Sequence, residues 1–235
     1  MNSVAGANLC SDGWAAHNIW QHSAEVRELY ARRARDEAEE MTCAAQAAEL
    51  IGRLARPGDS LIDAGCGSGY FFHSLRRRNI PVDYYGIDAT EVFVEIGNAV
   101  LSAFGLPPDR LQAIRIEDFR GEADHVLCMN VISNIDNYHR PLERLLMAAR
   151  RSLVLRESIK DGASYRYVRD NFLDAGIDLK VHVNAYDRAD IVDFIQSYGF
   201  RVEQVTDRRS GGRPEDVIGY PHHWTFLVAQ RIAAE

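Results

Sequence analysis

Three glycines at alternate positions follow an apolar run and an aspartate. The segment reads Leu61-Ile62-Asp63-Ala64-Gly65-Cys66-Gly67-Ser68-Gly69 and continues into Tyr70-Phe71-Phe72. Glycine lets the backbone take positive φ and approach a ligand closely, and the helix expected after the turn offers unpaired N–H groups at its positive end. The chemistry that this pattern favours is the binding of a nucleotide-type cofactor.

Phosphate-bearing cofactors fit this turn poorly. A dinucleotide fingerprint would place its third glycine at position 72, which is Phe72, and the Gly-Lys-Ser/Thr sequence of a P-loop is absent. The purely structural alternative is an ordinary glycine-rich turn in an α/β domain.

The pattern Asp63-x-Gly65-x-Gly67-x-Gly69 resembles the first motif of class I S-adenosylmethionine-dependent methyltransferases. The resemblance implies that the loop backbone, Cys66 included, lies against the methionine portion of the cofactor. It also implies that Asp63 helps to place the ammonium group of that portion. The motif order resembles the family from about 61 to 156, and the remainder does so in topology only.

A second acid ends the next expected strand, residues 82–88. Asp88 lies 19 positions after Gly69. A carboxylate can accept hydrogen bonds from two vicinal hydroxyls, so we expect Asp88, with its neighbour Ala89, at the cofactor ribose. The alternative is a helix N-cap, because Asp88-Ala89-Thr90-Glu91 precedes the apolar positions of a helix. Asp88 can serve both roles.

Two later strand ends complete the predicted cofactor site. The family commonly uses an acid after its third strand for the adenine amino group, which implies Glu117 or Asp118 here, and Phe119 offers an apolar face to the purine. Taken alone, both acids are typical of a solvated loop. The fourth strand, 124–132, is nearly continuous in apolar residues, as in a strand covered on both faces, and it brings Asn130 toward the cofactor.

The sequence after the fourth strand disfavours two branches of the family. Enzymes that methylate amino groups of DNA or glutamine carry Asp/Asn-Pro-Pro-Tyr/Phe where this chain has Met129-Asn130-Val131-Ile132. Methylation of cytosine carbon 5 uses a Pro-Cys nucleophile, whereas Cys128 follows Leu127 and is interpreted as a buried small hydrophobe.

Methyl transfer to a hydroxyl needs a base, and histidine titrates in the right range. We expect His182 or His223 in that role, with His139 and His222 as further candidates. A structural role is the alternative for each histidine, and strand alternation lets only one of the adjacent pair point inward. Asp178 with His182 and His222 could bind a divalent cation, but this spacing defines no metal site, and none is assigned.

Residues 1–56 are interpreted as a helical cap that belongs to the same domain. The stretch from about 23 to 54 is rich in Ala, Glu and Arg and is closed by Pro57-Gly58. Tyr30 and Arg33 share one face of such a helix and are predicted to clamp the carboxylate of the cofactor. In related enzymes the N-terminal helices cover the cofactor.

The segments together predict a doubly wound α/β fold with a mostly parallel seven-stranded sheet and an antiparallel last strand. Residues 57–235 form the methyltransferase domain, with a substrate-facing insertion at about 158–190. The expected strands begin at 61 and then span 82–88, 111–116, 124–132, 152–156, 200–205 and 224–229.

Composition narrows the partners. A chain of 235 residues, 46% hydrophobic, can bury one substantial core. Its formal charge of −7 disfavours nucleic acid, although several arginine clusters keep an RNA or protein methyltransferase open as an alternative. No apolar run approaches the ~20 residues that span a membrane, and no secretory signal precedes the domain, so we expect a cytoplasmic protein with four reduced cysteines.

The sequence therefore predicts an S-adenosylmethionine-dependent methyltransferase that acts on a small or carrier-linked acceptor, with O-methylation of a sugar or secondary metabolite as the expected reaction. A homo-oligomer is left open. The alternatives from other classes are a non-catalytic protein that binds S-adenosylmethionine and, more distantly, a dinucleotide-dependent oxidoreductase.

Overall fold

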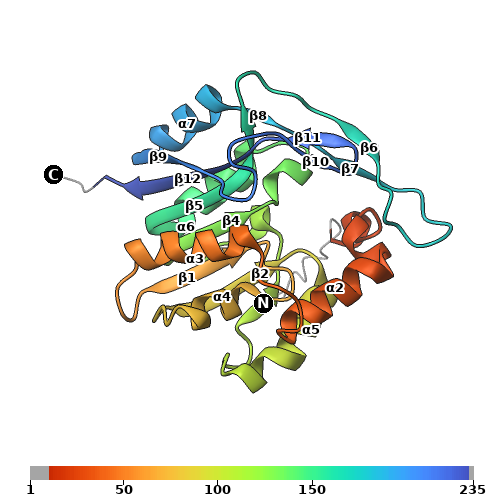
Figure 1. The fold of residues 1–235 in the computed structure, drawn as a ribbon, viewed down its shortest axis with the longest axis horizontal. Helices are drawn as coiled ribbons and strands as arrows, with labels where there is room; N and C mark the ends of the chain where they lie inside the picture. Colours follow the sequence, from red (N-terminus) through yellow and green to blue (C-terminus); the bar gives the residue numbers. More distant parts are fainter. Residues whose placement is uncertain (1–10, 233–235) are drawn as a thin grey trace, which may run out of the picture.

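A computed structural model describes residues 11–232 and is built around one mixed sheet (Figure 1). Seven strands run in the order β3-β2-β1-β4-β5-β12-β9, and the short β8, Tyr186–Asp187, pairs with β5. Their bounds are Ser60–Ala64 (β1), Asp83–Asp88 (β2), Leu111–Ala113 (β3), Ala123–Met129 (β4), Ala149–Lys160 (β5), Phe200–Thr206 (β9) and Trp224–Arg231 (β12). The predicted mostly parallel seven-stranded sheet is confirmed.

The last strand reverses direction. β12 pairs antiparallel with β5 and with β9, placing Leu227 opposite both Leu155 and Gln204. Every other neighbouring pair in the row of seven is parallel. The carboxyl ends of the parallel strands therefore meet at one edge of the sheet, where α/β proteins bind their ligands.

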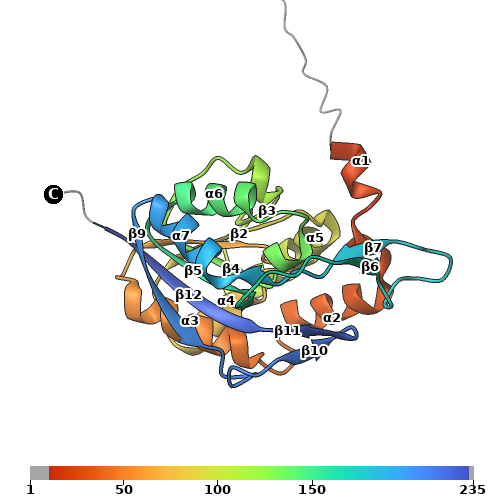
Figure 2. The ribbon, with the colours of Figure 1, turned by 90° about the horizontal axis from the view of Figure 1, so that it is seen from above.

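Helices cover both faces of the sheet (Figure 2). Because successive strand residues point to opposite faces, Leu61 and Val154 pack with one helical layer while Ile62 and Leu153 pack with the other. The first layer holds α3 (Thr42–Leu54), α4 (Phe71–Arg77) and α5 (Glu91–Val100), and the second holds α6 (His139–Ala148) and α7 (Arg188–Ser197).

The chain before α3 lies at the ligand-binding edge. Its elements are α1 (Ser11–Ala15), η1 (Ile19–His22) and α2 (Ala24–Ala34). Ser23 starts α2 because its hydroxyl accepts a hydrogen bond from the Val26 N–H at 3.3 Å. The α2 helix then packs against α5, close to the turn after β1.

Two small hairpins cover the same edge of the sheet (Figures 1 and 2). The insertion after β5 forms β6 (Tyr167–Arg169) and β7 (Lys180–His182), and the segment before β12 forms β10 (Glu215–Val217) and β11 (Tyr220–His222). A small apolar cluster of Ile19, Val181 and Val183 joins the insertion to η1.

Three strands end three or more residues away from the sequence expectation. β3 ends at Ala113, because residues Ile116–Asp118 form the 3-10 turn η3. β4 ends at Met129, because Asn130 turns the chain with φ of +59° into η4, Ile132–Asn134. β5 extends to Lys160, because Ser158 pairs with Trp224 and Ile159 with Tyr186, so the predicted insertion begins inside a strand. The remaining 3-10 turn, η2, spans Leu101–Phe104 and follows α5.

Within residues 11–232, no helix has the length and apolar character needed to cross a membrane. Cys43, Cys66 and Cys128 are buried and free, whereas Cys10 lies outside the described residues.

Candidate active site

The turn after β1 is shaped by glycines that touch other elements. Gly65, Gly67 and Gly69 have φ of +80°, +56° and +71°. A Cβ added to Gly67 would lie 2.1 Å from Cε1 of Tyr30, and one added to Gly65 would lie 2.2 Å from Cγ2 of Val131. These two positions therefore require glycine both for backbone conformation and for space.

Hydrogen bonds within the turn fix its path. The N–H groups of Gly65 and Cys66 donate to the Ile87 carbonyl at 2.8 and 3.0 Å, and Gly69 donates to the Cys66 carbonyl at 2.9 Å. The Cys66 thiol lies in the core beneath Gly86, and burial raises its pKa well above the ordinary value. Cys66 can thus contact a ligand through its backbone but not through a reactive thiolate.

Asp63 is a buried acid at the end of β1. Its carboxyl group is 3% exposed and accepts one hydrogen bond, from the Tyr84 hydroxyl at 2.8 Å. Burial raises the pKa of Asp63 to about 7, and the nearby Asp88 adds to this effect, while Tyr84 opposes it. A buried carboxylate with so little compensation is suited to a cationic ligand group.

Asp88 bridges the first and second strand ends. One carboxylate oxygen accepts from the Gly67 N–H at 2.8 Å, and the other accepts from the Thr90 N–H at 2.7 Å. Burial raises the pKa of Asp88, and these two N–H groups partly offset it. The N-cap position of α5 itself belongs to Thr90. Since each carboxylate oxygen has two lone pairs, Asp88 can still accept hydrogen bonds from ribose hydroxyls, with Ala89 beside it.

The predicted pair on α2 lies directly over the glycine turn. The Tyr30 ring contacts Gly67 and stacks on Phe93 of α5 with centroids 4.2 Å apart, and the Ser68 hydroxyl donates to the Tyr30 carbonyl at 2.8 Å. The Arg33 guanidinium carbon lies 5.3 Å from the Tyr30 ring centroid. Burial raises the pKa of Tyr30 to about 12, so its phenol stays protonated and able to donate.

The third strand end is more open. Asp118 is exposed, whereas Glu117 is partly buried and paired with Arg115 at 3.2 Å. The ring of Phe119 packs against Gly121 and the core beside α6. Arg115 in turn lies 5.4 Å from the ring of Trp14. The structure therefore places these three predicted residues directly after β3, with the Phe119 ring turned partly into the core.

Asn130 is fixed by the neighbouring strand. Its side-chain oxygen accepts a short hydrogen bond from a terminal nitrogen of Arg156 in β5. Asn130 also donates its backbone N–H to the Arg156 carbonyl at 2.9 Å. The predicted position of Asn130 at the ligand-binding edge follows from its place directly after β4.

The two histidines predicted as base lie apart in the fold. His182, in β7, stacks on Tyr167 with centroids 4.5 Å apart. His223 directly precedes β12 and donates its backbone N–H to the Ser158 hydroxyl at 3.0 Å. Burial lowers the pKa of His223. It also lowers the pKa of His222, which is more deeply buried and stacks on Trp224. Both adjacent imidazoles therefore favour the neutral form.

Several residues of this site were not found by sequence reasoning. Tyr84 lies in the middle of a strand and Phe93 in a helix, where an aromatic residue is ordinarily core. Arg156 and Glu157 gave the one available signal, since two charged residues directly follow the apolar run Leu153-Val154-Leu155.

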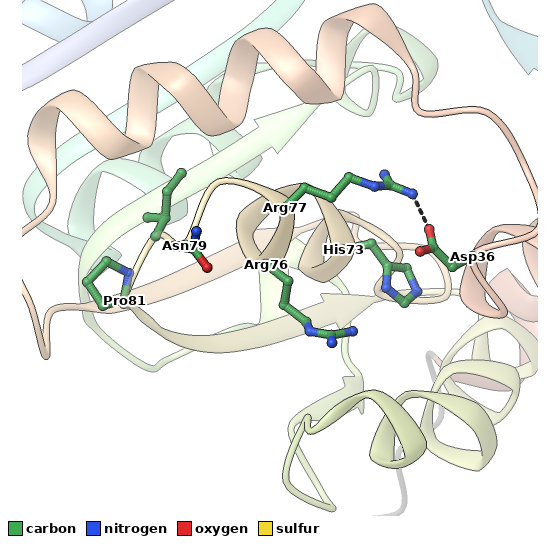
Figure 3. A pocket seen from close by; sticks show the side chains of 7 residues that line it. Asp36, His73, Arg76, Arg77, Asn79 and Pro81 are labelled. Carbon is green, nitrogen blue, oxygen red and sulfur yellow. Dashed lines mark hydrogen bonds and ion pairs between the residues drawn. The ribbon is translucent and has the colours of Figure 1, made fainter.

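No group of three His, Cys, Asp or Glu side chains in residues 11–232 is arranged to hold a metal ion. Two surface cavities, of about 540 and 830 Å³, lie away from the glycine turn. The smaller one flanks α4, where Arg77 pairs with Asp36 beside His73 (Figure 3). Neither cavity includes a residue of the glycine turn.

The strand order and the helices on both faces of the sheet define a Rossmann-like α/β fold. Residues 30–205 match the family model described as a methyltransferase domain, which is more than half of the chain, so the protein belongs to this family. No curated protein matches the chain by sequence.

Solved structures share the fold at low sequence identity. Magnesium protoporphyrin IX methyltransferase (ChlM) from Synechocystis PCC 6803 with bound SAM is 17% identical, with 94% of this chain and 97% of that chain covered and a TM-score of 0.61. The amino pentose methyltransferase CalS10 from Micromonospora echinaspora with bound SAM is 17% identical, with 87% and 96% covered and a TM-score of 0.57. The N-terminal domain of EvdMO1, in the presence of SAH and D-fucose, is 17% identical, with 90% and 99% covered and a TM-score of 0.59.

The protein is an S-adenosylmethionine-dependent methyltransferase of class I. The chemistry of its residues fits this cofactor, because the buried carboxyl of Asp63 has one hydrogen-bond partner and would suit a cationic group, and Asp88 keeps acceptor capacity for hydroxyls.

Proposed function

We propose that the methyl acceptor is a small molecule, free or carrier-linked, and that the reaction is O-methylation of a sugar or secondary metabolite. The observation that carries the proposal is the similarity to whole methyltransferase chains and domains, among them one that acts on an amino pentose, one named for magnesium protoporphyrin IX and one crystallised in the presence of D-fucose. We extend to this chain the small size of those compounds and not their identity.

The charge arrangement favours a small acceptor over RNA. Most of the arginine clusters that could meet a polyanion have carboxylate partners: Arg78 with Glu40 at 2.7 Å, Arg208 with Glu49 at 2.6 Å, and the pairs Arg77–Asp36, Arg150–Glu122 and Arg209–Glu215. A partnered arginine has less net field to attract phosphates. Salt-sensitive polynucleotide binding would favour the RNA alternative.

We propose that His223 is the base and His182 the second candidate. A base must be neutral to accept the proton of a hydroxyl. Burial holds the pKa of His223 below its ordinary value, which favours that neutral form. His182 is partly exposed and lies on the strand position next to Val181, which packs toward η1, so its ring faces the other side of the hairpin.

The residues that would hold the cofactor lie around the glycine turn and at the ends of β2 and β3. We propose that Asp63 and the backbone of 65–69 meet the methionine portion, Tyr30 and Arg33 its carboxylate, Asp88 and Ala89 the ribose, and 117–119 the adenine. The bound cofactor supplies an activated methyl group on a sulfonium, so the protein has to align the acceptor, exclude water and take up a proton.

The remaining organisation is proposed on the same basis. We propose that the predicted cap, residues 1–56, belongs to the domain that continues from 57 to 235, and that the insertion at 158–190 faces the acceptor; residues 1–10 and 233–235 lie outside the described residues. Cytoplasmic localisation and a homo-oligomer stay predictions, which cell fractionation and light scattering of the purified protein would test.

The direct test is methyl transfer from carbon-13-labelled S-adenosylmethionine to a panel of free sugars, nucleotide sugars and phenols, followed by NMR of the product methyl group. The proposal expects turnover on a hydroxyl compound and a methyl resonance typical of a methyl ether. Transfer only to amines, protein or RNA would contradict it. Tight binding of the cofactor with no turnover on any compound would favour the non-catalytic alternative.

A further inference from the structure

Two consecutive charged residues lie inside the central strand β5. Arg156 is 2% exposed and Glu157 is fully buried, although the preceding residues of the strand, Leu153, Val154 and Leu155, are apolar. Burial of a charged group is costly unless it is paired or hydrogen-bonded. Both residues therefore call for a role beyond packing.

Glu157 holds the backbone that follows Asn130. One of its carboxylate oxygens accepts from the N–H groups of Val131 and Ile132 at 2.9 and 3.0 Å, and the other accepts from the N–H and hydroxyl of Ser133 at 2.9 and 2.7 Å. All four donors belong to one short turn. Glu157 thus fixes the turn, and its burial is explained.

Arg156 points to the opposite face of β5 and reaches the same segment through a side chain. Its Nε donates to Asp207 at 2.7 Å, and a terminal nitrogen donates to the side-chain oxygen of Asn130. The guanidinium carbon lies 4.5 Å from the ring centroid of Trp224, which covers the cation. Burial disfavours the Asp207 carboxylate, but the hydrogen bond and charge of Arg156 outweigh this effect and keep the pKa of Asp207 below its ordinary value. Arg156 and Asp207 are therefore both charged.

The hydrogen bond from Arg156 sets the orientation of the Asn130 amide. Because the carbonyl oxygen is held by a guanidinium, which has only donors, the amide cannot flip without placing its N–H2 group against a cation. The N–H2 group is therefore left for another partner, and no hydrogen bond from it to residues 11–232 occurs. Asn130 also follows β4 next to Val131, which contacts the glycine turn at Gly65.

We propose that Arg156, supported by Asp207, is a positioning residue that makes Asn130 a hydrogen-bond donor toward the carboxylate of the amino-acid portion of the cofactor. The inference rests on the proposed contact between Asn130 and the cofactor. It goes beyond that contact, because it assigns a role to a buried ion pair that touches neither cofactor nor acceptor.

A double-mutant cycle on cofactor affinity tests the proposal. The probes are S-adenosylhomocysteine and 5′-methylthioadenosine, which lacks the amino-acid portion, and both are titrated by calorimetry into the full-length protein. Asn130→Gly removes the amide while tolerating the positive φ. Arg156→Lys keeps a charge for Asp207 but loses the planar fork that reaches both partners. Arg156→Met with Asp207→Asn removes the pair without leaving a buried lone charge.

The proposal expects each of the three variants to weaken S-adenosylhomocysteine about tenfold, the scale of a hydrogen bond to a charged group, with 5′-methylthioadenosine unchanged. In the Asn130→Gly background, Arg156→Lys should add less than about twofold, because its target is gone. Thermal unfolding of each variant without ligand identifies variants that are not folded, and the charge-neutral double variant serves if Arg156→Lys fails to fold.

The outcomes separate the two proposals. If Asn130→Gly leaves S-adenosylhomocysteine affinity unchanged, the contact of Asn130 with the cofactor is wrong and the positioning role falls with it. If Asn130→Gly weakens binding but the Arg156 variants do not, or if the effects add in full, the contact stands and the positioning role is wrong. An equal loss for both probes would assign Arg156 to the general structure of the crevice.

Discussion

The protonation state of Asp63 should control cofactor affinity near neutral pH. Its pKa in the ligand-free protein is raised by burial to about 7. Only the ionised form attracts the ammonium group of the cofactor. With a pKa of 7, about 10% of the carboxyl groups are ionised at pH 6 and about 90% at pH 8. We therefore expect affinity for S-adenosylhomocysteine to be about tenfold higher at pH 8 than at pH 6.

Calorimetry across this pH range, with two controls, measures the effect. 5′-Methylthioadenosine has no ammonium group, so its affinity should not follow Asp63. Asp63→Asn should weaken S-adenosylhomocysteine at pH 8 and abolish the pH dependence between 6 and 8. Tyr84→Phe removes the hydrogen bond that opposes the upward shift, so the midpoint should move to higher pH.

The same group should affect stability with a defined sign. The pKa of Asp63 in the folded protein lies above its ordinary value of 3.8, so the native state binds more protons between these values, and the Asp63 contribution to stability is lost as pH rises through about 7. The largest effect is about 4 kcal/mol, from a shift of about 3 pKa units. The difference in unfolding free energy between wild type and Asp63→Asn should therefore change between pH 5 and 8. A pH-independent difference, together with pH-independent wild-type affinity, would refute the reasoning.

Three further predictions follow from the contacts of the site. Gly67→Ala should abolish cofactor binding and lower the free energy of unfolding by about 2 kcal/mol, because the new Cβ would lie 2.1 Å from the Tyr30 ring. The control is Gly105→Ala, which tests backbone strain alone, because Gly105 has φ of +93° and no atom within 4 Å of the new Cβ. Equal losses of unfolding free energy in the two variants would refute the steric argument. Glu157→Ala should lower the free energy of urea unfolding by about 3 kcal/mol or more, since it leaves the three N–H groups of residues 131–133 unpaired, and a change below about 1 kcal/mol would contradict this. Once an acceptor is known, His223→Ala should lower kcat about a hundredfold, whereas His182→Ala should leave most activity. The wild-type rate should rise with pH through a value below 6.5, because burial lowers the pKa of His223. Undiminished turnover of the His223 variant, with or without sensitivity to a chelator, would show that His223 is not the base.

The fold could be predicted because its signals are local. β1 and β2 are apolar runs that end at a glycine or an acid, β4 is a nearly continuous apolar run, and these patterns located all three strands to within a few residues. The end of β5 was misplaced for a non-local reason. Whether Ser158 continues a strand depends on its partner Trp224, which lies far away in the sequence.

The position of the predicted cofactor residues in the fold was largely accessible to sequence reasoning, because most of them follow strand ends in a fixed order. Asp63 and Asp88 do meet around the glycine turn, and Tyr30 with Arg33 does lie above it. The contacts that tune these residues were not accessible. Tyr84 and Asp207 act on partners that are 21 and 51 residues away, so no spacing rule reveals them.

A crystal structure of the protein with S-adenosylhomocysteine tests the central claim most directly. The account predicts the homocysteine portion against the backbone of 65–69 with its ammonium group beside Asp63, and the ribose hydroxyls on Asp88. A ligand bound elsewhere, or a crevice that admits a nicotinamide dinucleotide and not S-adenosylhomocysteine, would contradict it.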